Sequence, residues 1–247
     1  MRDGCRLRRL KRFEVSAGTI LSSILYSLSS ILYPLSSLLS PHPRSFKCME
    51  FMMNQLDIDL LQWFQPQNPS LCDGLILVLT NGLTWIPLYL ILLYILLTSP
   101  PTGGVKDGSR WQLFTKIVLG LLCVAFVASF NNFLVKPYVG RLRPCCDPDM
   151  EGVFRLVKGY CDGNYSFFSS HAANTSAVAV YFSIVIRKRW LTVCLILWCL
   201  LNCYTRLYLA QHYPSDILCG LLFGTCSALL FYRLNQLSNS IIRDHLP

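Results

Sequence analysis

The sequence predicts an all-α protein, a polytopic membrane helical bundle with about five core transmembrane helices. The 247-residue chain is 53% hydrophobic and only 14% charged, with a mean hydropathy of +0.44. That apolar content exceeds what one soluble core of this length requires. The apolar residues also gather into runs that approach the roughly 20 residues needed to cross a bilayer. A third observation is that the few ionisable residues outside the N-terminus cluster beside these runs.

Five apolar segments carry this prediction. They are Leu83–Leu97, extended backwards by Leu71–Thr80, then Ile117–Leu134, Ala172–Ile186, Trp190–Cys203 and Ile217–Phe231. Several are shorter than the roughly 20 residues of a perpendicular span, so we expect their helices to continue into flanking polar residues. The segment from Glu50 to Phe64 mixes apolar residues with two aspartates, which favours an interfacial helix over a span.

Charge in the loops predicts the orientation. Basic residues lie between the first and second segments, between the third and fourth, and after the fifth: Lys106, Arg110, Arg187, Lys188, Arg189, Arg233 and Arg243. If the helices alternate in direction, all of these loops share one face, and the positive-inside rule makes that face cytoplasmic. The net charge of +9 does not indicate nucleic acid as a partner, because six of the 22 basic residues lie within the first 12 positions.

Three clusters of polar residues fall at the opposite ends of these segments. They are Lys136 with Arg143 and Pro144, then Ser169, Ser170 and His171, then Arg206, His212 and Asp216. Each has an ordinary structural interpretation when taken alone. A single cation at a helix end can extend its charge to the interface, a serine can cap a helix, and a His–Asp pair four residues apart can be a structural hydrogen bond. Together they place anion-binding groups on one membrane face, where ionisable residues are costly unless they serve a function.

The spacing of these residues resembles a known family. Lys136-x6-Arg143-Pro144, Phe168-Ser169-Ser170-His171 and Thr205-Arg206-x5-His212-x3-Asp216 are similar to the signature K-x6-R-P, P-S-G-H, S-R-x5-H-x3-D. That signature belongs to the type 2 phosphatidic acid phosphatase and vanadium haloperoxidase superfamily. Phe168, Ser170 and Thr205 depart from it. The Ser170 substitution bears on the backbone amide that a glycine gives to phosphate in the family.

The residue types predict a phosphoric ester hydrolase. Lys136, Arg143 and Arg206, with Ser169 and the Ser170 amide, can neutralise the phosphate oxygens without a metal, so no metal or other cofactor is expected. His212 is the expected nucleophile, because Asp216 can accept from one ring nitrogen and leave the other free. The resemblance implies that His171 protonates the leaving group and later activates water to hydrolyse a phosphohistidine.

The resemblance also bears on the substrate. The expected site lies at the membrane interface, which favours a phosphorylated lipid as partner. The sequences GLTWIPLY and SFFSSHAAN resemble bacterial, Bacteroidetes-type members of the family, some of which remove the 4′-phosphate of lipid A. Undecaprenyl diphosphate and phosphatidylglycerophosphate remain alternatives, as does a non-catalytic lipid-binding or transport protein. The apolar segments disfavour a soluble vanadate-dependent haloperoxidase. We expect a bacterial inner-membrane protein with its active site facing the periplasm.

The chain is expected to divide into three parts. Residues 81–247 form the membrane-embedded phosphatase domain, and residues 49–80 form an interfacial helical segment. Residues 1–48 are a basic, Ser/Leu-rich extension with an imperfect seven-residue repeat from Ser22 to Ser40. This extension fits an anchor helix, a cleaved signal peptide, or translated upstream sequence with the functional start at Met49, Met52 or Met53.

Twelve cysteines do not predict a disulfide framework, because at least half of them lie within the apolar segments. Cys145, Cys146 and Cys161 differ, since they occupy the loop on the expected periplasmic face, where oxidation is possible. The sequence leaves open whether Cys161 forms a bridge. Zinc is not expected there, because a fourth ligand at suitable spacing is missing.

Overall fold

The computed structural model describes residues 55–98 and 106–245, so the N-terminal extension lies outside the described residues. The described chain is helical, and its β-structure is one isolated antiparallel bridge between Leu142 and Tyr165. A helical segment covers residues 55–64. The later elements are α3 (Asp73–Thr80), η1 (Gly82–Trp85), α4 (Ile86–Thr98), α5 (Lys106–Phe130), η2 (Asn131–Val135), α6 (Lys136–Val139), η3 (Pro148–Met150), η4 (Val157–Gly159), α7 (Ser170–Ile186), α8 (Arg189–Tyr208) and α9 (Pro214–His245).

All five predicted apolar segments are helical, but the count of five spans is not confirmed. Three stretches within the described residues are long and apolar enough to cross a membrane: Trp111–Val139, Arg189–Tyr208 and Pro214–Ser240. Helices α3 and η1–α4 make a fourth candidate only if taken together, because they bend by 72° at their junction. Helix α7 has 17 residues and stays below that length, since it starts at the second motif and ends where Arg187 adopts a left-handed conformation.

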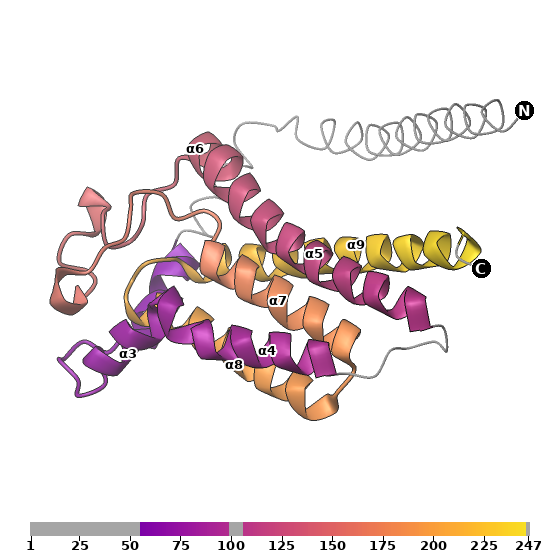
Figure 1. Cartoon of the computed structure of the whole chain (residues 1–247). Helices are drawn as coiled ribbons and strands as arrows, with labels where there is room; N and C mark the ends of the chain where they lie inside the picture. Colours follow the sequence, from indigo (N-terminus) through magenta and orange to yellow (C-terminus); the bar gives the residue numbers. More distant parts are fainter. Residues whose placement is uncertain (1–54, 99–105, 246–247) are drawn as a thin grey trace, which may run out of the picture. The chain divides into compact units, whose positions relative to one another are not determined.

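Helices α5, α7 and α9 pack against one another and form the centre of the described bundle (Figure 1). The contact between α7 and α9 depends on two glycines four residues apart. A Cβ at Gly220 would lie 2.7 Å from the Ser169 carbonyl oxygen. A Cβ at Gly224 would overlap the carbonyl oxygen of Ala173 and the hydroxyl of Ser176. Small residues at such spacing allow close helix approach in membranes, and here they bring the start of α7 against the first turns of α9.

The connection from α6 to α7 is a long loop with little regular structure. Two of its segments pair side by side, because the Arg143 N–H donates to the Asn164 carbonyl at 3.0 Å and the Ser166 N–H donates to the Arg141 carbonyl at 2.8 Å. A second tie connects the loop to the start of the described chain. Arg155 forms an ion pair with Asp73 at 2.8 Å, and its backbone N–H donates to the Gln65 amide oxygen. The loop is therefore closed by pairing between its own two ends, and Arg155 ties its middle to the start of the described chain.

Residues 55–64 form a helix, as predicted, but two of its side chains are buried more deeply than in a helix that lies on the membrane surface. Leu61 is fully buried and packs into the main apolar cluster, whereas Trp63 is exposed. Asp57 is only 5% exposed. A buried carboxylate requires partners, and those of Asp57 lie at the site described next.

Candidate active site

Helix ends deliver the predicted site residues to one end of the bundle. Lys136 begins α6, Ser169 and His171 lie at the start of α7, Arg206 lies in the last turn of α8, and Asp216 lies in the first turn of α9. His212 occupies the short turn between α8 and α9 and is 1% exposed. The basic residues Arg187, Lys188 and Arg189 lie at the other ends of α7 and α8.

The electrostatics of His212 are dominated by burial and by nearby cations. Burial lowers the pKa of His212 well below its usual value, and Arg206, Arg143, Lys136 and His171 lower it further. A buried imidazole surrounded by cations stays neutral, because a positive charge there would be desolvated and repelled. A neutral ring is the form that can attack phosphorus.

The second motif is positioned by its backbone and by two asparagines. Ser169 is the N-cap of α7, its hydroxyl accepts from the Ala172 N–H at 3.4 Å, and its own N–H donates to the Asp216 carbonyl at 3.1 Å. The Ser170 hydroxyl accepts from Asn131 at 2.8 Å and donates to Asn132 at 3.1 Å. Both serine hydroxyls are thus already engaged.

The two asparagines come from η2, a π-helical turn inside the long helix that ends in α6. Such turns occur frequently at functional sites because they redirect side chains. Asn131 is fully buried and also donates to the Phe168 carbonyl at 2.8 Å. The sequence analysis missed this residue, and the only signal for it was an Asn–Asn pair within an apolar run.

The two buried arginines meet at Gln211. Its side-chain oxygen accepts from the Arg143 guanidinium at 2.7 Å and lies 3.5 Å from that of Arg206. Arg206 has no exposed surface and also donates to the Thr80 hydroxyl at 2.7 Å, whereas the carboxylate of Asp162 stays 3.8 Å away. Neutral acceptors therefore hold most of this positive charge in place. The sequence analysis missed Gln211, although it directly precedes His212.

Thr80 is a third site residue, after Asn131 and Gln211, that could not be predicted from the sequence. It ends α3, is buried, and its hydroxyl accepts from Arg206 at 2.7 Å. The bend between α3 and η1 follows directly after Thr80. The break in the first apolar segment therefore has a role, because it places polar groups of α3 beside the site.

The expected hydrogen bond between His212 and Asp216 is not formed. The nearest atoms, Nδ1 of His212 and Oδ2 of Asp216, are 3.8 Å apart, and Nδ1 has no hydrogen-bond partner among the described residues. Other donors occupy the carboxylate: the Arg141 guanidinium at 2.9 Å and the Tyr213 N–H at 3.0 Å. Catalytic hydrogen bonds are often long without substrate, and 3.8 Å leaves Asp216 as the nearest carboxylate to the ring.

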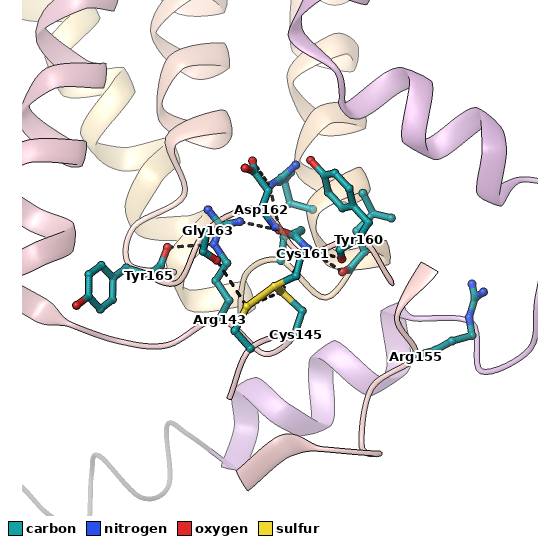
Figure 2. The surroundings of a disulfide bond; sticks show 12 residues. Arg143, Cys145, Arg155, Tyr160, Cys161, Asp162, Gly163 and Tyr165 are labelled. Carbon is teal, nitrogen blue, oxygen red and sulfur yellow. Dashed lines mark hydrogen bonds and ion pairs between the residues drawn. A yellow bond between two sulfur atoms is a disulfide. The ribbon is translucent and has the colours of Figure 1, made fainter. Parts of the chain in front are cut away.

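The loop beside the arginines carries a disulfide (Figure 2). Cys145 and Cys161 are bonded, with their Cα atoms 5.9 Å apart, and the sulfur of Cys146 also lies against Cys161. The Cα separation to Cys146 is 6.9 Å, at the limit of what a bridge allows, so Cys145 is the better partner. The bridge closes the loop next to Arg143 and Gln211, whose side-chain N–H group donates to the Cys145 sulfur.

An apolar cavity of about 650 Å³ lies between α4, α5 and α7. Asn174, one turn after His171, is its polar lining residue, and the oxygen of that side chain is buried without a partner. The other lining residues are aliphatic or aromatic and include Tyr89, Leu92, Val124 and Phe182. The cavity therefore has one polar lining residue on the helix that begins with the second motif, and its other walls are apolar.

Comparisons with known proteins agree with this geometry. A lipid A 4′-phosphatase of Bacteroides thetaiotaomicron is 33% identical over 202 residues, which cover 81% of this chain and 85% of that protein. One of Porphyromonas gingivalis is 28% identical and covers 68% of this chain and 67% of its own length.

Two solved structures share the fold. A transmembrane PAP2-type phosphatidylglycerolphosphate phosphatase from Bacillus subtilis matches 75% of this chain and 87% of its own, with a TM-score of 0.55 and 16% identity. Aquifex aeolicus LpxE matches 72% and 95%, with a TM-score of 0.50 and 19% identity. Residues 115–240 match the PAP2 superfamily, a range that contains all three motifs. The chain therefore belongs to the PAP2 superfamily.

Proposed function

We propose that the protein is an integral membrane lipid phosphatase that removes the 4′-phosphate of lipid A through a phosphohistidine intermediate. The observation that carries the chemistry is the placement of neutral, buried His212 among Lys136, Arg143 and Arg206. Three cations near one imidazole are costly to the fold, since they repel each other and are poorly solvated. They suit a dianion that brings its own negative charge.

The phosphate-binding roles follow from charge and position. Arg143 and Arg206 would exchange the neutral oxygen of Gln211 for phosphate oxygens, which form stronger charge-assisted hydrogen bonds. Lys136 adds a third positive charge. Ser169 and Ser170 begin α7, so their backbone N–H groups and the helix N-terminus favour an anion there.

The reaction has two steps. In the first, Nε2 of His212 bonds to phosphorus as the ester P–O bond breaks. His171 becomes protonated once the bound phosphate dianion offsets the burial and the nearby Arg206 that lower its pKa, and it gives that proton to the leaving alkoxide. Asp216, beside Nδ1, stabilises the positive charge that develops on the ring. In the second step, His171 takes a proton from water, the resulting hydroxide attacks phosphorus, the P–N bond breaks, and inorganic phosphate leaves. No step requires a metal.

A lipid substrate is supported by the cavity between α4, α5 and α7. Its lining suits acyl chains, and its position near His171 lets one molecule occupy the polar site and the membrane together. Lipid A is favoured over other phosphorylated lipids by the names of the two relatives, which align along most of this chain.

Phosphate release from a panel of lipids tests the proposal. Purified protein should release phosphate fastest from 4′-phosphorylated lipid A, compared with undecaprenyl diphosphate and phosphatidylglycerophosphate. Activity should survive EDTA and should be inhibited by vanadate, which adopts the five-coordinate geometry of the transition state. Faster release from another lipid would reassign the substrate, and a strict requirement for magnesium would contradict the mechanism.

We further propose that the protein lies in a bacterial inner membrane with His212 facing the periplasm. Support comes from Arg187, Lys188 and Arg189, which lie at the ends of α7 and α8 opposite His171 and Arg206. The orientation can be tested with single cysteines and a membrane-impermeant thiol reagent on intact spheroplasts. The Cys145–Cys161 bridge is kept while the other cysteines are replaced. A cysteine at Asp149 should be labelled and one at Lys188 should not. The reverse pattern would invert the topology.

A further inference from the structure

Asp57 contributes a buried carboxylate to the site from a distant part of the sequence. It lies on the helical segment 55–64 and is 5% exposed. Its Oδ2 accepts from the Arg141 guanidinium at 2.7 Å and from the Ser215 hydroxyl, and its Oδ1 accepts from the Ser215 N–H at 3.0 Å. Ser215 is 158 residues further along the chain and directly precedes Asp216.

Arg141 joins this carboxylate to that of Asp216. One terminal nitrogen donates to Asp57, and the other donates to Asp216 at 2.9 Å and to the Ser215 hydroxyl at 2.8 Å. The guanidinium also lies over the Tyr213 ring, 3.9 Å from its centre. One cation is therefore shared by two carboxylates, and the planar guanidinium fixes the angle between them.

We propose that Asp57 is a positioning residue for the reaction: acting through Arg141 and Ser215, it sets the place and the charge of Asp216 beside His212. The inference rests on the proposed hydrolysis through phosphohistidine and adds a residue that lies outside the three motifs and touches neither substrate nor nucleophile.

Arg141 divides its positive charge between the carboxylates of Asp57 and Asp216. If Arg141 faced Asp216 alone, the pair would be close to neutral, and Asp216 would do little to stabilise a cationic His212 ring. Asp57 draws part of the guanidinium charge to itself. The group of three keeps a net charge of −1, which favours the positive charge that forms on His212 during phosphoryl transfer.

Asp57 also holds the first turn of α9 in place. The first N–H groups of a helix have no partner within it, and a side-chain acceptor that satisfies one of them fixes the first turn. Asp57 provides this acceptor for the Ser215 N–H. The turn held in this way contains Asp216, whose Oδ2 accepts from the Tyr213 N–H, so Asp57 restrains the carboxylate and the backbone next to His212 together.

Asp57→Asn removes the negative charge but nearly preserves the shape of the side chain, because asparagine retains an acceptor oxygen for Ser215. The matched control is Asp59→Asn on the same helical segment, where the side chain is exposed and accepts a hydrogen bond from the Gln55 amide. Titration with vanadate counts the competent phosphate sites in each preparation, so kcat is expressed per vanadate-binding site. This removes any effect of misfolded protein.

We expect Asp57→Asn to lower kcat per vanadate site about 10- to 100-fold, the range for groups that orient a reactive histidine from outside the first contacts. Vanadate affinity and KM should stay within about twofold, since the cations that bind phosphate are unchanged. Asp57→Glu should recover part of the lost kcat, and Asp59→Asn should match the wild type.

A second comparison tests whether the effect passes through Arg141. In a protein that already carries Arg141→Gln, adding Asp57→Asn should lower kcat per vanadate site by a much smaller factor than it does in the wild type. The reason is that the effects of coupled residues are not additive. A kcat per vanadate site equal to that of the wild type in Asp57→Asn would overturn the inference and leave Asp57 a purely structural residue. An equal loss of kcat in the wild-type and Arg141→Gln proteins would show that Asp57 does not act through Arg141.

The substrate is tested separately. The Asp57 comparison uses whichever phosphorylated lipid the wild-type protein hydrolyses fastest. Lack of activity on lipid A therefore counts against the proposed substrate alone, and an effect of Asp57 on another lipid would still be measured.

Discussion

Two arginines of the same motif, Arg141 and Arg143, have opposite surroundings. Arg141 donates to two carboxylates, which outweigh the effect of burial and raise its pKa. Arg143 donates to the Gln211 amide oxygen and to a backbone carbonyl, and burial together with nearby Arg206 lowers its pKa to about 10. A cation paired with carboxylates has its charge compensated before substrate arrives. A cation held by neutral acceptors keeps its charge for an incoming anion.

The site therefore has two sides around His212. On the side of Arg143 and Arg206, neutral acceptors meet most of the positive charge and the Asp162 carboxylate is 3.8 Å from Arg206, so this side is suited to bind phosphate. On the side of Arg141, two carboxylates outweigh one cation, and this side is suited to hold the nucleophile. The distinction teaches that a basic residue within a phosphate-binding motif need not bind phosphate.

The largest expected effect comes from the residue between the two sides. His212→Ala should abolish turnover, because no other group can form the phosphorus–nitrogen bond. Asp216→Asn should retain a trace, a loss of about 10⁴-fold at most, since the carboxylate orients and stabilises the ring without attacking phosphorus. Steady-state phosphate release measures both, and trapping of acid-labile phosphoenzyme separates them. Wild-type activity in His212→Ala would remove the assignment.

Replacing Arg141 and Arg143 one at a time tests directly whether they have different roles. Arg143→Gln should weaken vanadate binding about 100-fold or more, as expected when a preorganised cation is lost, and should leave thermal stability close to that of the wild type. Arg141→Gln should instead destabilise the fold by about 3 kcal/mol, because Asp57 and Asp216 remain buried without their partner. Denaturation in detergent and vanadate titration distinguish the two outcomes.

Exposed Arg233 provides the control for both variants, and Arg233→Gln should change neither quantity. Equal losses of stability in Arg141→Gln and Arg143→Gln would contradict the division into two sides.

The pH dependence sharpens the comparison further. His212 attacks only when neutral, and its pKa lies well below the usual value of about 6.5, so kcat/KM should persist at pH values below 6.5. Arg143→Gln removes a nearby positive charge and should raise the pKa of His212. The acid limb of kcat/KM should then move to higher pH. The pH profiles of kcat/KM are measured for both proteins with the same substrate, so that ionisation of the substrate affects both equally. A shift to lower pH would contradict this electrostatic account.

The smallest effect is expected when residues 1–48 alone are removed. A chain that begins at Met49 retains Asp57 and should insert, fold and hydrolyse as well as the full-length protein. A chain that begins at Asp59 loses the acceptor of Arg141 and should lose most of its activity. Membrane insertion and phosphate release measure both. Failure of the Met49 form to insert would identify the preceding residues as an anchor.

The sequence predicted the parts of the site that depend on spacing along one helix or one turn. Lys136, Arg143, Arg206, His171 and His212 could be assigned together because fixed intervals between polar residues stand out in apolar segments. Asp57, Thr80 and Gln211 could not, because each is a single polar residue whose role depends on contacts with distant elements. The same limit explains the wrong expectation of a direct His212–Asp216 hydrogen bond, since i,i+4 spacing does not show that Arg141 and the Tyr213 N–H occupy the carboxylate.

The fold shows a similar division. Apolar runs located all five segments, but their lengths did not reveal the 72° bend after Thr80 or the π-helical turn at Asn131–Val135. Both irregularities arise where polar side chains must reach the site, and tertiary contacts there outweigh the regular helical pattern.

The two glycines of α9 have a consequence for how the enzyme responds to its lipid surroundings. Bilayers of different thickness tilt or shift single helices at a cost of fractions of a kcal/mol per ångström. Gly220 and Gly224 bring the backbones of α9 and α7 into direct contact, so the two helices move as one body. His171 starts one of them and Asp216 the other. We therefore expect the separation of His171 and Asp216 to change little between bilayers of different thickness.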